Sequence, residues 1–264
     1  MKLAHVADLH FGAARMDVLA AAQDAILNAR PDALIVSGDV SQRGKRVEFA
    51  AAREWVDEIG LPSLVVPGNH DTPLLNVHAR ATAPFARYRD YFGDLTRSLK
   101  IGSGRIDPLN TARGWQARKN WAEGSVRLSD LEAAIEASGS AHHPHLLACH
   151  HPFRSMQGAL LRTETRRGDI ASQRVAASPV SVVLTGHVHT PHVEEVVEPG
   201  GKYLAVSAGT LSTRLRRAPP GFNMLSFSPD KVSVTAFALS GDVFVAQPTR
   251  SEEHTSELQS LSSI

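Results

Sequence analysis

Five short polar blocks stand out in this sequence, because each of them follows an apolar run. Their side chains are carboxylates, an amide and imidazoles, which borderline divalent metals accept as ligands without any thiolate. Short apolar runs are typical of buried strands, and the carboxyl ends of parallel strands meet at one edge of a sheet. We therefore expect the blocks to converge on a metal site. In chain order they are Asp8-Leu9-His10, Gly38-Asp39, Gly68-Asn69-His70-Asp71, His150-His151-Pro152 and Gly186-His187-Val188-His189.

The spacing within the blocks indicates which side chains can share an ion. Residues two apart in an extended chain project to the same side, so Asp8 with His10, and His187 with His189, suit a common metal. His150 and His151 are adjacent and project oppositely, and their spacing does not decide which of them reaches the metals.

Asp39 and the block around Asn69 add different chemistry. A carboxylate such as Asp39 can bridge two cations, which an imidazole cannot. Pro67 and Gly68 turn the chain sharply, and Asn69 then offers a neutral amide oxygen. His70 faces another way and is free to act on substrate, with Asp71 placed to orient it.

The remaining metal-ligating residue types favour structural roles. We expect His5 to support the first strand, and Cys149 to be a small buried residue. The other histidines that flank predicted strands are expected to be solvated or capping; these are His142, His143, His145 and His192.

The order of apolar runs predicts an α/β fold. Strands over 3–7, 33–36 and 63–66 alternate with amphipathic helices that stop at Pro31 and Gly60, which makes two right-handed βαβ units. Residues 72–124 look like an irregular insertion with a helical stretch. A capping box from Ser129 to Glu132 predicts the next helix, and strands are expected at 146–148 and 182–184. After Gly186 alternating segments predict antiparallel strands in a second sheet packed on the first.

The bulk composition fits one large α/β domain. The chain has 264 residues, 42% hydrophobic residues and a formal net charge of +1, which gives no support for binding a nucleic-acid duplex. One cysteine excludes an intrachain disulfide, and no apolar run approaches the roughly 20 residues that cross a bilayer. With no signal peptide visible, the expected location is the cytoplasm.

Residues 250–264 do not share the strand pattern, since they are polar and rich in serine. The string from Arg250 to Ser260 resembles a translated sequencing-library adapter. We therefore expect one domain over 1–249, followed by a non-native or disordered tail. Resequencing the locus tests this, because the same codons in genomic DNA would contradict it.

The five blocks in this order resemble the calcineurin-like metallophosphoesterase superfamily, over roughly residues 3–237. Segments 38–44, 109–113 and 220–223 resemble its bacterial cyclic-nucleotide phosphodiesterase subgroup. The resemblance implies a four-layer αββα sandwich, in which two mixed β-sheets are flanked by helices. It also implies a two-metal phosphoesterase acting on a small phosphorylated substrate, such as a 3',5'-cyclic nucleotide.

The same resemblance assigns roles to the blocks. Asp8, His10 and His189 would hold one ion and Asp39 would bridge to a second, which would be held by Asn69, His150 and His187. His150 is then preferred over His151. A metal-bridged hydroxide would attack phosphorus, with His70 as the general acid. Manganese, iron and zinc all suit these ligands, and Arg113 would reach the substrate phosphate. Arg43 and the arginines of 214–217 suggest the same role.

Three alternatives share this fold. A Ser/Thr protein phosphatase would have a second aspartate at Gln42 and a glutamate at Asp71, so the sequence disfavours it. A repair nuclease would need a DNA-capping domain, for which little chain remains after Phe237. A metal-free scaffold would lack several of these side chains, and none is missing. Phosphomonoesters and other diesters remain open as substrates, as does the oligomeric state.

Overall fold

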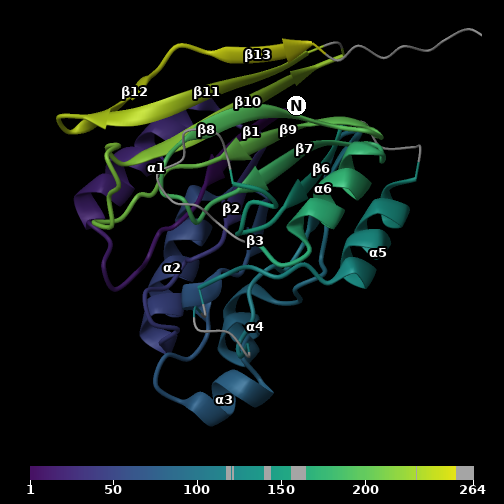
Figure 1. Cartoon of the computed structure of the whole chain (residues 1–264). Helices are drawn as coiled ribbons and strands as arrows, with labels where there is room; N and C mark the ends of the chain where they lie inside the picture. The colour runs from purple at the N-terminus through teal and green to yellow at the C-terminus, as the bar shows by residue number, and fades with distance from the viewer. Residues whose placement is uncertain (117–119, 121, 140–143, 156–164, 230, 254–264) are drawn as a thin grey trace, which may run out of the picture.

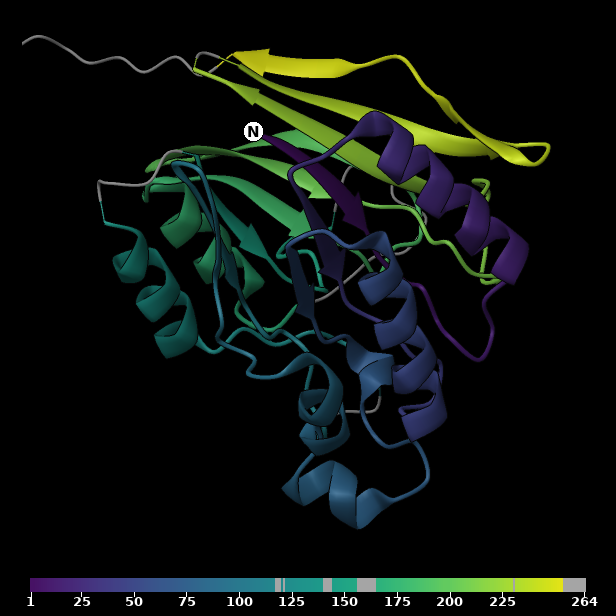
Figure 2. The same cartoon turned by 180° about the vertical axis from the view of Figure 1, so that it is seen from behind.

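The fold consists of four layers. A computed structural model describes residues 1–116, 120, 122–139, 144–155, 165–229 and 231–253. Two β-sheets face each other, and helices cover the outer face of each sheet (Figures 1 and 2). This arrangement confirms the predicted αββα sandwich.

The first sheet is built around the N-terminal strand. Its strand order is β12-β11-β10-β1-β2-β3, and β13 pairs with β11 beside β12. The central strand β1 runs parallel to β2 and antiparallel to β10, so it joins the two ends of the chain. The strands are β1 (Lys2–Val6), β2 (Ala33–Ser37), β3 (Ser63–Val66), β10 (Gly221–Ser228), β11 (Lys231–Ser240), β12 (Val243–Ala246) and β13 (Arg250–Glu253).

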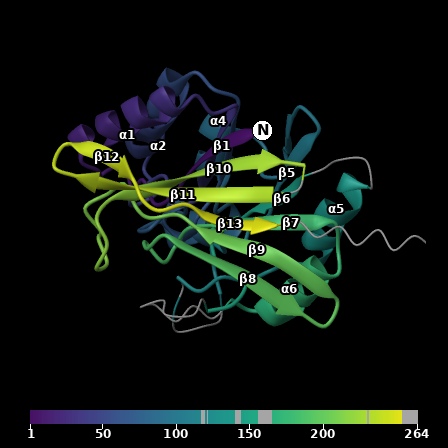
Figure 3. The ribbon, with the colours of Figure 1, turned by 90° about the horizontal axis from the view of Figure 1, so that it is seen from above.

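The second sheet has the order β4-β5-β6-β7-β9-β8. Its inner strands β5, β6, β7 and β9 are parallel, and an antiparallel strand lies at each edge. In the view from above, β8 and β9 are drawn in the lower part of the picture, and β10, β11 and β13 lie higher on the page (Figure 3). The strands are β4 (Leu99–Ile101), β5 (Gly104–Pro108), β6 (His145–Ala148), β7 (Val180–Thr185), β8 (His192–Glu198) and β9 (Gly201–Ser207).

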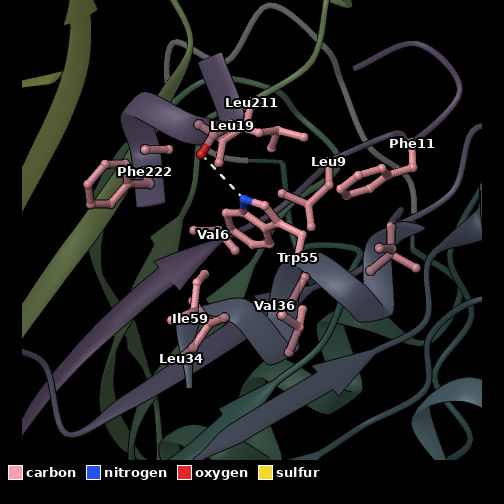
Figure 4. Packing of buried hydrophobic residues seen from close by; sticks show 14 of the residues in the cluster. Val6, Leu9, Phe11, Leu19, Leu34, Val36, Trp55, Ile59, Leu211 and Phe222 are labelled. Carbon is pink, nitrogen blue, oxygen red and sulfur yellow. Dashed lines mark hydrogen bonds between the residues drawn. The ribbon is translucent and has the colours of Figure 1, made fainter. Parts of the chain in front are cut away.

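Helices pack on the outer faces because the strands are apolar on both sides. Along β1, Ala4 and Val6 face the α1–α2 layer, whereas Leu3 faces the second sheet. In the α1–α2 layer the Trp55 indole N–H donates to the Leu19 carbonyl at 3.3 Å (Figure 4). The helices are α1 (Met16–Ala29), α2 (Arg46–Ile59), η1 (Asn69–Asp71), α3 (Val77–Thr82), α4 (Ala86–Phe92), α5 (Leu128–Ser138) and α6 (Gly168–Ala176).

The strands of the second half are distributed differently from the prediction. Only β8 and β9 of the strands after Gly186 join the second sheet, whereas β10, β11 and β12 extend the first. The reason is that β1 has one edge paired with β2 and offers the other to β10. The predicted second sheet is also mainly parallel in its centre, not antiparallel.

Two local predictions are also corrected. Residues 72–124 contain α3, α4 and the β4–β5 hairpin, and β5 is a full member of the second sheet. Helix α5 begins at Leu128 after Arg127, so Ser129 lies inside the helix, where its hydroxyl donates to Asp130 at 3.3 Å. The capping box at Ser129 is therefore absent.

The first four residues of the expected tail pair with the sheet. Backbone pairing joins β13 to β11, with Arg250 opposite Val234. Residues 254–264 lie outside the described residues. The domain limit near Thr249 stays a prediction.

Candidate metal centre

The predicted ligands all follow the carboxyl ends of parallel strands, four after strands of the first sheet and three after strands of the second. Asp8 and His10 follow β1, Asp39 follows β2, and Asn69 follows β3. His150 follows β6, and His187 and His189 follow β7. Because the two sheets are stacked, these strand ends form one common edge.

The backbone of this edge is strained where the ligands sit. Five of the predicted ligands have a positive φ between 45° and 69°. Such a conformation costs roughly 1–2 kcal/mol for a residue with a Cβ, so it persists only where the surroundings impose it. The five are Asp8, His10, Asp39, His187 and His189.

Asp8, His10 and His189 form the first ligand group. The Asp8 carboxylate Oδ1 lies 3.1 Å from His189 Nε2 and 3.7 Å from His10 Nε2. The two imidazole Nε2 atoms are 3.4 Å apart. The other oxygen of Asp8 accepts the backbone N–H of His187 at 2.8 Å, which fixes the carboxylate in this orientation.

Asp39, Asn69 and His150 form the second group, with His187 beside them. His150 Nε2 lies 3.3 Å from Asp39 Oδ2 and 3.2 Å from the Asn69 amide oxygen. The His187 ring centre is 5.1 Å from that of His150. Asp39 Oδ2 is also 3.8 Å from His10 Nε2, so this carboxylate faces both groups.

His151 is buried with both ring nitrogens engaged by the protein. Its Nδ1 lies 2.9 Å from the Thr111 hydroxyl and its Nε2 lies 2.9 Å from the Ala122 carbonyl. His150 instead directs Nδ1 at the Ser37 carbonyl and keeps Nε2 toward Asp39. This geometry favours His150 as the ligand. Cys149 is fully buried, and burial raises the pKa of its thiol, so it stays protonated.

His70 lies at the rim of the two groups. Its backbone N–H donates to Asp39 Oδ1 at 2.8 Å, and its ring centre is 4.8 Å from that of His10. Its Nδ1 lies 2.8 Å from the Gln42 carbonyl, which can only accept, so Nδ1 carries the proton. Its Nε2 lies 2.8 Å from Arg214 Nη1.

Asp71 has a different role from the one expected. Its carboxylate accepts the Ser41 N–H at 2.8 Å, the Ser41 hydroxyl at 2.7 Å and the Gly68 N–H at 2.8 Å. These bonds brace the loops after β2 and β3 against each other. The His70 ring is oriented by Gln42 instead, so Asp71 positions the ligand loops.

Two glycines provide the space for these ligands. At Gly38, where φ is +85°, a Cβ would lie 2.6 Å from His150 Cγ and closer still to Nδ1. At Gly186 a Cβ would lie 2.7 Å from Asp8 Oδ2. Any other side chain at either position would displace a ligand.

The electrostatics of the site fit the binding of cations. Burial disfavours a charged His150, yet the nearby Asp39 carboxylate outweighs it and raises the pKa of His150 to about 9. Asp8 likewise raises the pKa of His189 against the effect of burial. Both shifts show that the carboxylates favour positive charge at these positions, and a bound metal cation would supply that charge. The buried Asp8 Oδ1 accepts no hydrogen bond of good geometry, as expected for an oxygen that faces a metal.

Other predicted residues lie away from this centre. Arg113 donates through Nη1 to the carbonyls of Asn110 and Ala112, so this part of its guanidinium holds its own loop, and a contact with substrate stays a prediction. His145 is buried in β6 and lies 2.9 Å from Asp107, so it is neither solvated nor capping. His192 is partly exposed, 3.4 Å from Glu194. His142 and His143 lie outside the described residues.

The sequence carries no specific signal for Arg214 or the Gln42 carbonyl as partners of His70. Arg214 was one of several arginines in the segment 214–217, and spacing could not separate them. A backbone carbonyl leaves no signal in residue types at all.

An αββα sandwich with two adjoining Asp/His groups at its strand ends fits a metal-dependent hydrolase. A family model for the calcineurin-like phosphoesterases matches residues 1–191, and the chain belongs to this family. It is a metallophosphoesterase, and its Asp/His groups fit a site for divalent metal ions.

Relatives with assigned names are similar at low identity. The chain is 26% identical over 209 residues to a probable cyclic nucleotide phosphodiesterase of Synechococcus sp., covering 76% of this chain and 73% of the relative. It is 27% identical over 232 residues to a cAMP/cGMP dual specificity phosphodiesterase of Mycobacterium tuberculosis, covering 80% and 68%. Among solved structures, a dimetal phosphatase from Danio rerio matches with a TM-score of 0.63 at 13% identity, covering 93% of this chain and 98% of that one.

No helix in the described part of the chain is long and apolar enough to span a membrane.

Proposed function

We propose that this metallophosphoesterase hydrolyses a small phosphodiester, with 3',5'-cyclic nucleotides as the first candidates. The two relatives described above, which each cover three quarters or more of this chain, are cyclic nucleotide phosphodiesterases, one of them assigned as probable. A third relative, a glycerophosphodiester phosphodiesterase of Enterobacter lignolyticus, is 38% identical over 82 residues, or 27% of this chain. All three names describe enzymes that act on a phosphodiester.

The observation that carries the proposal is the position of His70 beside two ligand groups that share Asp39. Asp8, His10 and His189 would hold one ion, and Asn69, His150 and His187 the other, with Asp39 between them. The bound ions would activate water and neutralise charge on the phosphate. Manganese, iron or zinc suits this set of nitrogen and oxygen donors.

His70, as an imidazolium protonated on Nε2 as well as on Nδ1, would supply the proton that the departing ester oxygen requires and would itself become neutral. The Gln42 carbonyl fixes the ring through Nδ1, which leaves Nε2 as the nitrogen that faces outward to substrate. The bond from the His70 backbone N–H to Asp39 ties this ring to the position between the two ligand groups. A positioned acid of this kind contributes typically 10²–10⁴-fold to the rate.

A turnover panel tests the proposal. Metal-stripped protein is reloaded separately with manganese, iron and zinc, and assayed on cyclic nucleotides, linear diesters and a chromogenic monoester. We expect diester hydrolysis that requires metal and that falls sharply in His70→Gln. Preference for monoesters would contradict the substrate assignment, and a fully active His70→Gln would contradict the general acid.

A further inference from the structure

Arg214 brings a cation to the metal centre that the other assignments do not use. It follows β9 in a loop at the same edge of the fold and is half-buried. Its Nη1 lies 2.8 Å from His70 Nε2 and 3.4 Å from His70 Nδ1. Within the described residues, no carboxylate lies within ion-pair distance of its guanidinium.

The contact with His70 leaves most of the guanidinium unsatisfied. Arginine has five N–H donors and stays charged, and a neutral imidazole nitrogen accepts only one of them. Two parallel bonds to a phosphate or carboxylate are the pairing that suits the planar fork. His70 therefore uses one N–H donor of the Arg214 guanidinium, whose geometry suits an anion.

The backbone of Arg214 is fixed, whereas its guanidinium contacts His70 alone among the residues that the structure describes. The Arg214 carbonyl accepts the Nδ1 proton of His189 at 2.6 Å, and its N–H donates to the Ser212 hydroxyl at 3.2 Å. The neighbouring Thr213 N–H and hydroxyl both contact the Ala13 carbonyl, at 3.2 and 2.9 Å. The loop thus holds the base of Arg214 against the first ligand group.

The charge of the metal-loaded site indicates that the Arg214 guanidinium binds an anion. Two divalent cations carry more positive charge than the Asp8 and Asp39 carboxylates can neutralise. A guanidinium that comes from the same edge adds to this excess, so the arrangement is favourable only when an anion lies between Arg214 and the ligand groups. A substrate phosphate is such an anion.

We propose that Arg214 is a phosphate-binding residue of this site. Its guanidinium leaves His70 Nε2 and binds the non-bridging oxygens of the phosphoester, which also uncovers His70 for the leaving group. The inference rests on the proposed function, and it names the residue that couples binding of the phosphate to the release of His70.

Three variants distinguish direct binding of phosphate by Arg214 from a general effect of positive charge in the loop. Arg214→Ala keeps the backbone carbonyl that His189 needs, and Arg214→Lys keeps a charge but not the fork. Arg216→Ala removes a second half-buried arginine two positions along the same loop. Each metal-loaded variant is measured for metal content, for the Kd of inorganic phosphate by calorimetry, and for kcat and KM. The ¹⁵N shift of His70 Nε2 is followed while phosphate is added.

Loss of one charge-assisted pair predicts a rise of about 10- to 100-fold in phosphate Kd and in KM for Arg214→Ala, with metal content unchanged. Arg214→Lys should fall between. Among the described residues Arg214 is the member of 214–217 that contacts His70, so the role suggested for Arg216 from the sequence is not expected and Arg216→Ala should match wild type. In wild type, phosphate should shift the His70 Nε2 signal, and in Arg214→Ala the signal should start from a shifted position. Wild-type phosphate affinity in Arg214→Ala, or an equal loss in Arg216→Ala, would overturn the assignment. If the wild type hydrolysed no phosphoester, the proposed function would fail, while phosphate affinity would still decide the role of Arg214.

Discussion

Replacing Gly38 by alanine should damage the metal centre through a single methyl group. Gly38 lies between the end of β2 and the ligand Asp39, with φ at +85°. The His150 ring occupies the space that a side chain at position 38 would fill. Gly60, at the end of α2, provides the matched control, because its φ is +68° and no atom lies within 4 Å of the added Cβ.

The two variants share one cost and differ in another. Positive φ costs an alanine roughly 1–2 kcal/mol, so both should lose about this much free energy of unfolding. In Gly38→Ala the new Cβ lies 2.6 Å from His150 Cγ, whereas ordinary contact begins at 3.4 Å. The ring has to withdraw by at least 0.8 Å, because Nδ1 lies closer still, and the bond from Nδ1 to the Ser37 carbonyl would be stretched or lost. Metal ligands tolerate deviations of only about 0.2 Å, so His150 should cease to coordinate.

Metal stoichiometry, urea unfolding and phosphodiester turnover should be measured on both variants. We expect Gly38→Ala to bind about one ion fewer than wild type and to lose most turnover, whereas Gly60→Ala keeps both. Urea unfolding of the metal-free proteins measures the shared strain. A Gly38→Ala protein with wild-type metal content and turnover would refute the placement of His150 as a ligand.

Three further changes test other parts of the site. His70→Gln should keep both ions but lower kcat by about 10²–10⁴-fold, as measured by elemental analysis and steady-state kinetics. Asp39→Asn should lose metal, because the shared carboxylate charge is removed, and normal occupancy by elemental analysis would exclude a bridging role. Burial lowers the pKa of His150, but the Asp39 carboxylate outweighs burial and raises this pKa to about 9. A metal that binds His150 at neutral pH must therefore displace a proton. Metal affinity should therefore rise from about pH 6 to about pH 8, and calorimetry in buffers of different ionisation enthalpy should detect proton release.

The residues proposed as metal ligands could be located from the sequence because strand ends leave a strong local signal. Ala33 to Val36 are fully buried, and such a run followed by Gly38 and Asp39 indicates both a strand and the residue at its carboxyl end. The same logic holds for β1, β3, β6 and β7. These strands supply every predicted metal ligand, and the structure brings those residues together.

What the sequence could not predict depends on pairing between distant segments. The sheet to which β10 belongs is decided by the free edge of β1, and no local pattern in residues 221–228 records it. Strand β5 was missed because Gly104 and Pro108 bound a run too short and too polar to resemble a buried strand. Asp71 was predicted to orient His70 because the two residues are adjacent in the sequence. Its carboxylate instead accepts a hydrogen bond from Ser41, 30 residues earlier.

The central place of β1 determines when this enzyme can mature during synthesis. Leu3 pairs with Ala33 on one side and with Leu225 on the other, so β1 can complete its pairing only after β10 has been synthesised. Until then Asp8 and His10 lie on an unfinished sheet whose open edge is exposed to other chains. Pairings this distant are slow to form, so chaperones that shield the nascent N-terminal half should raise the yield of active protein.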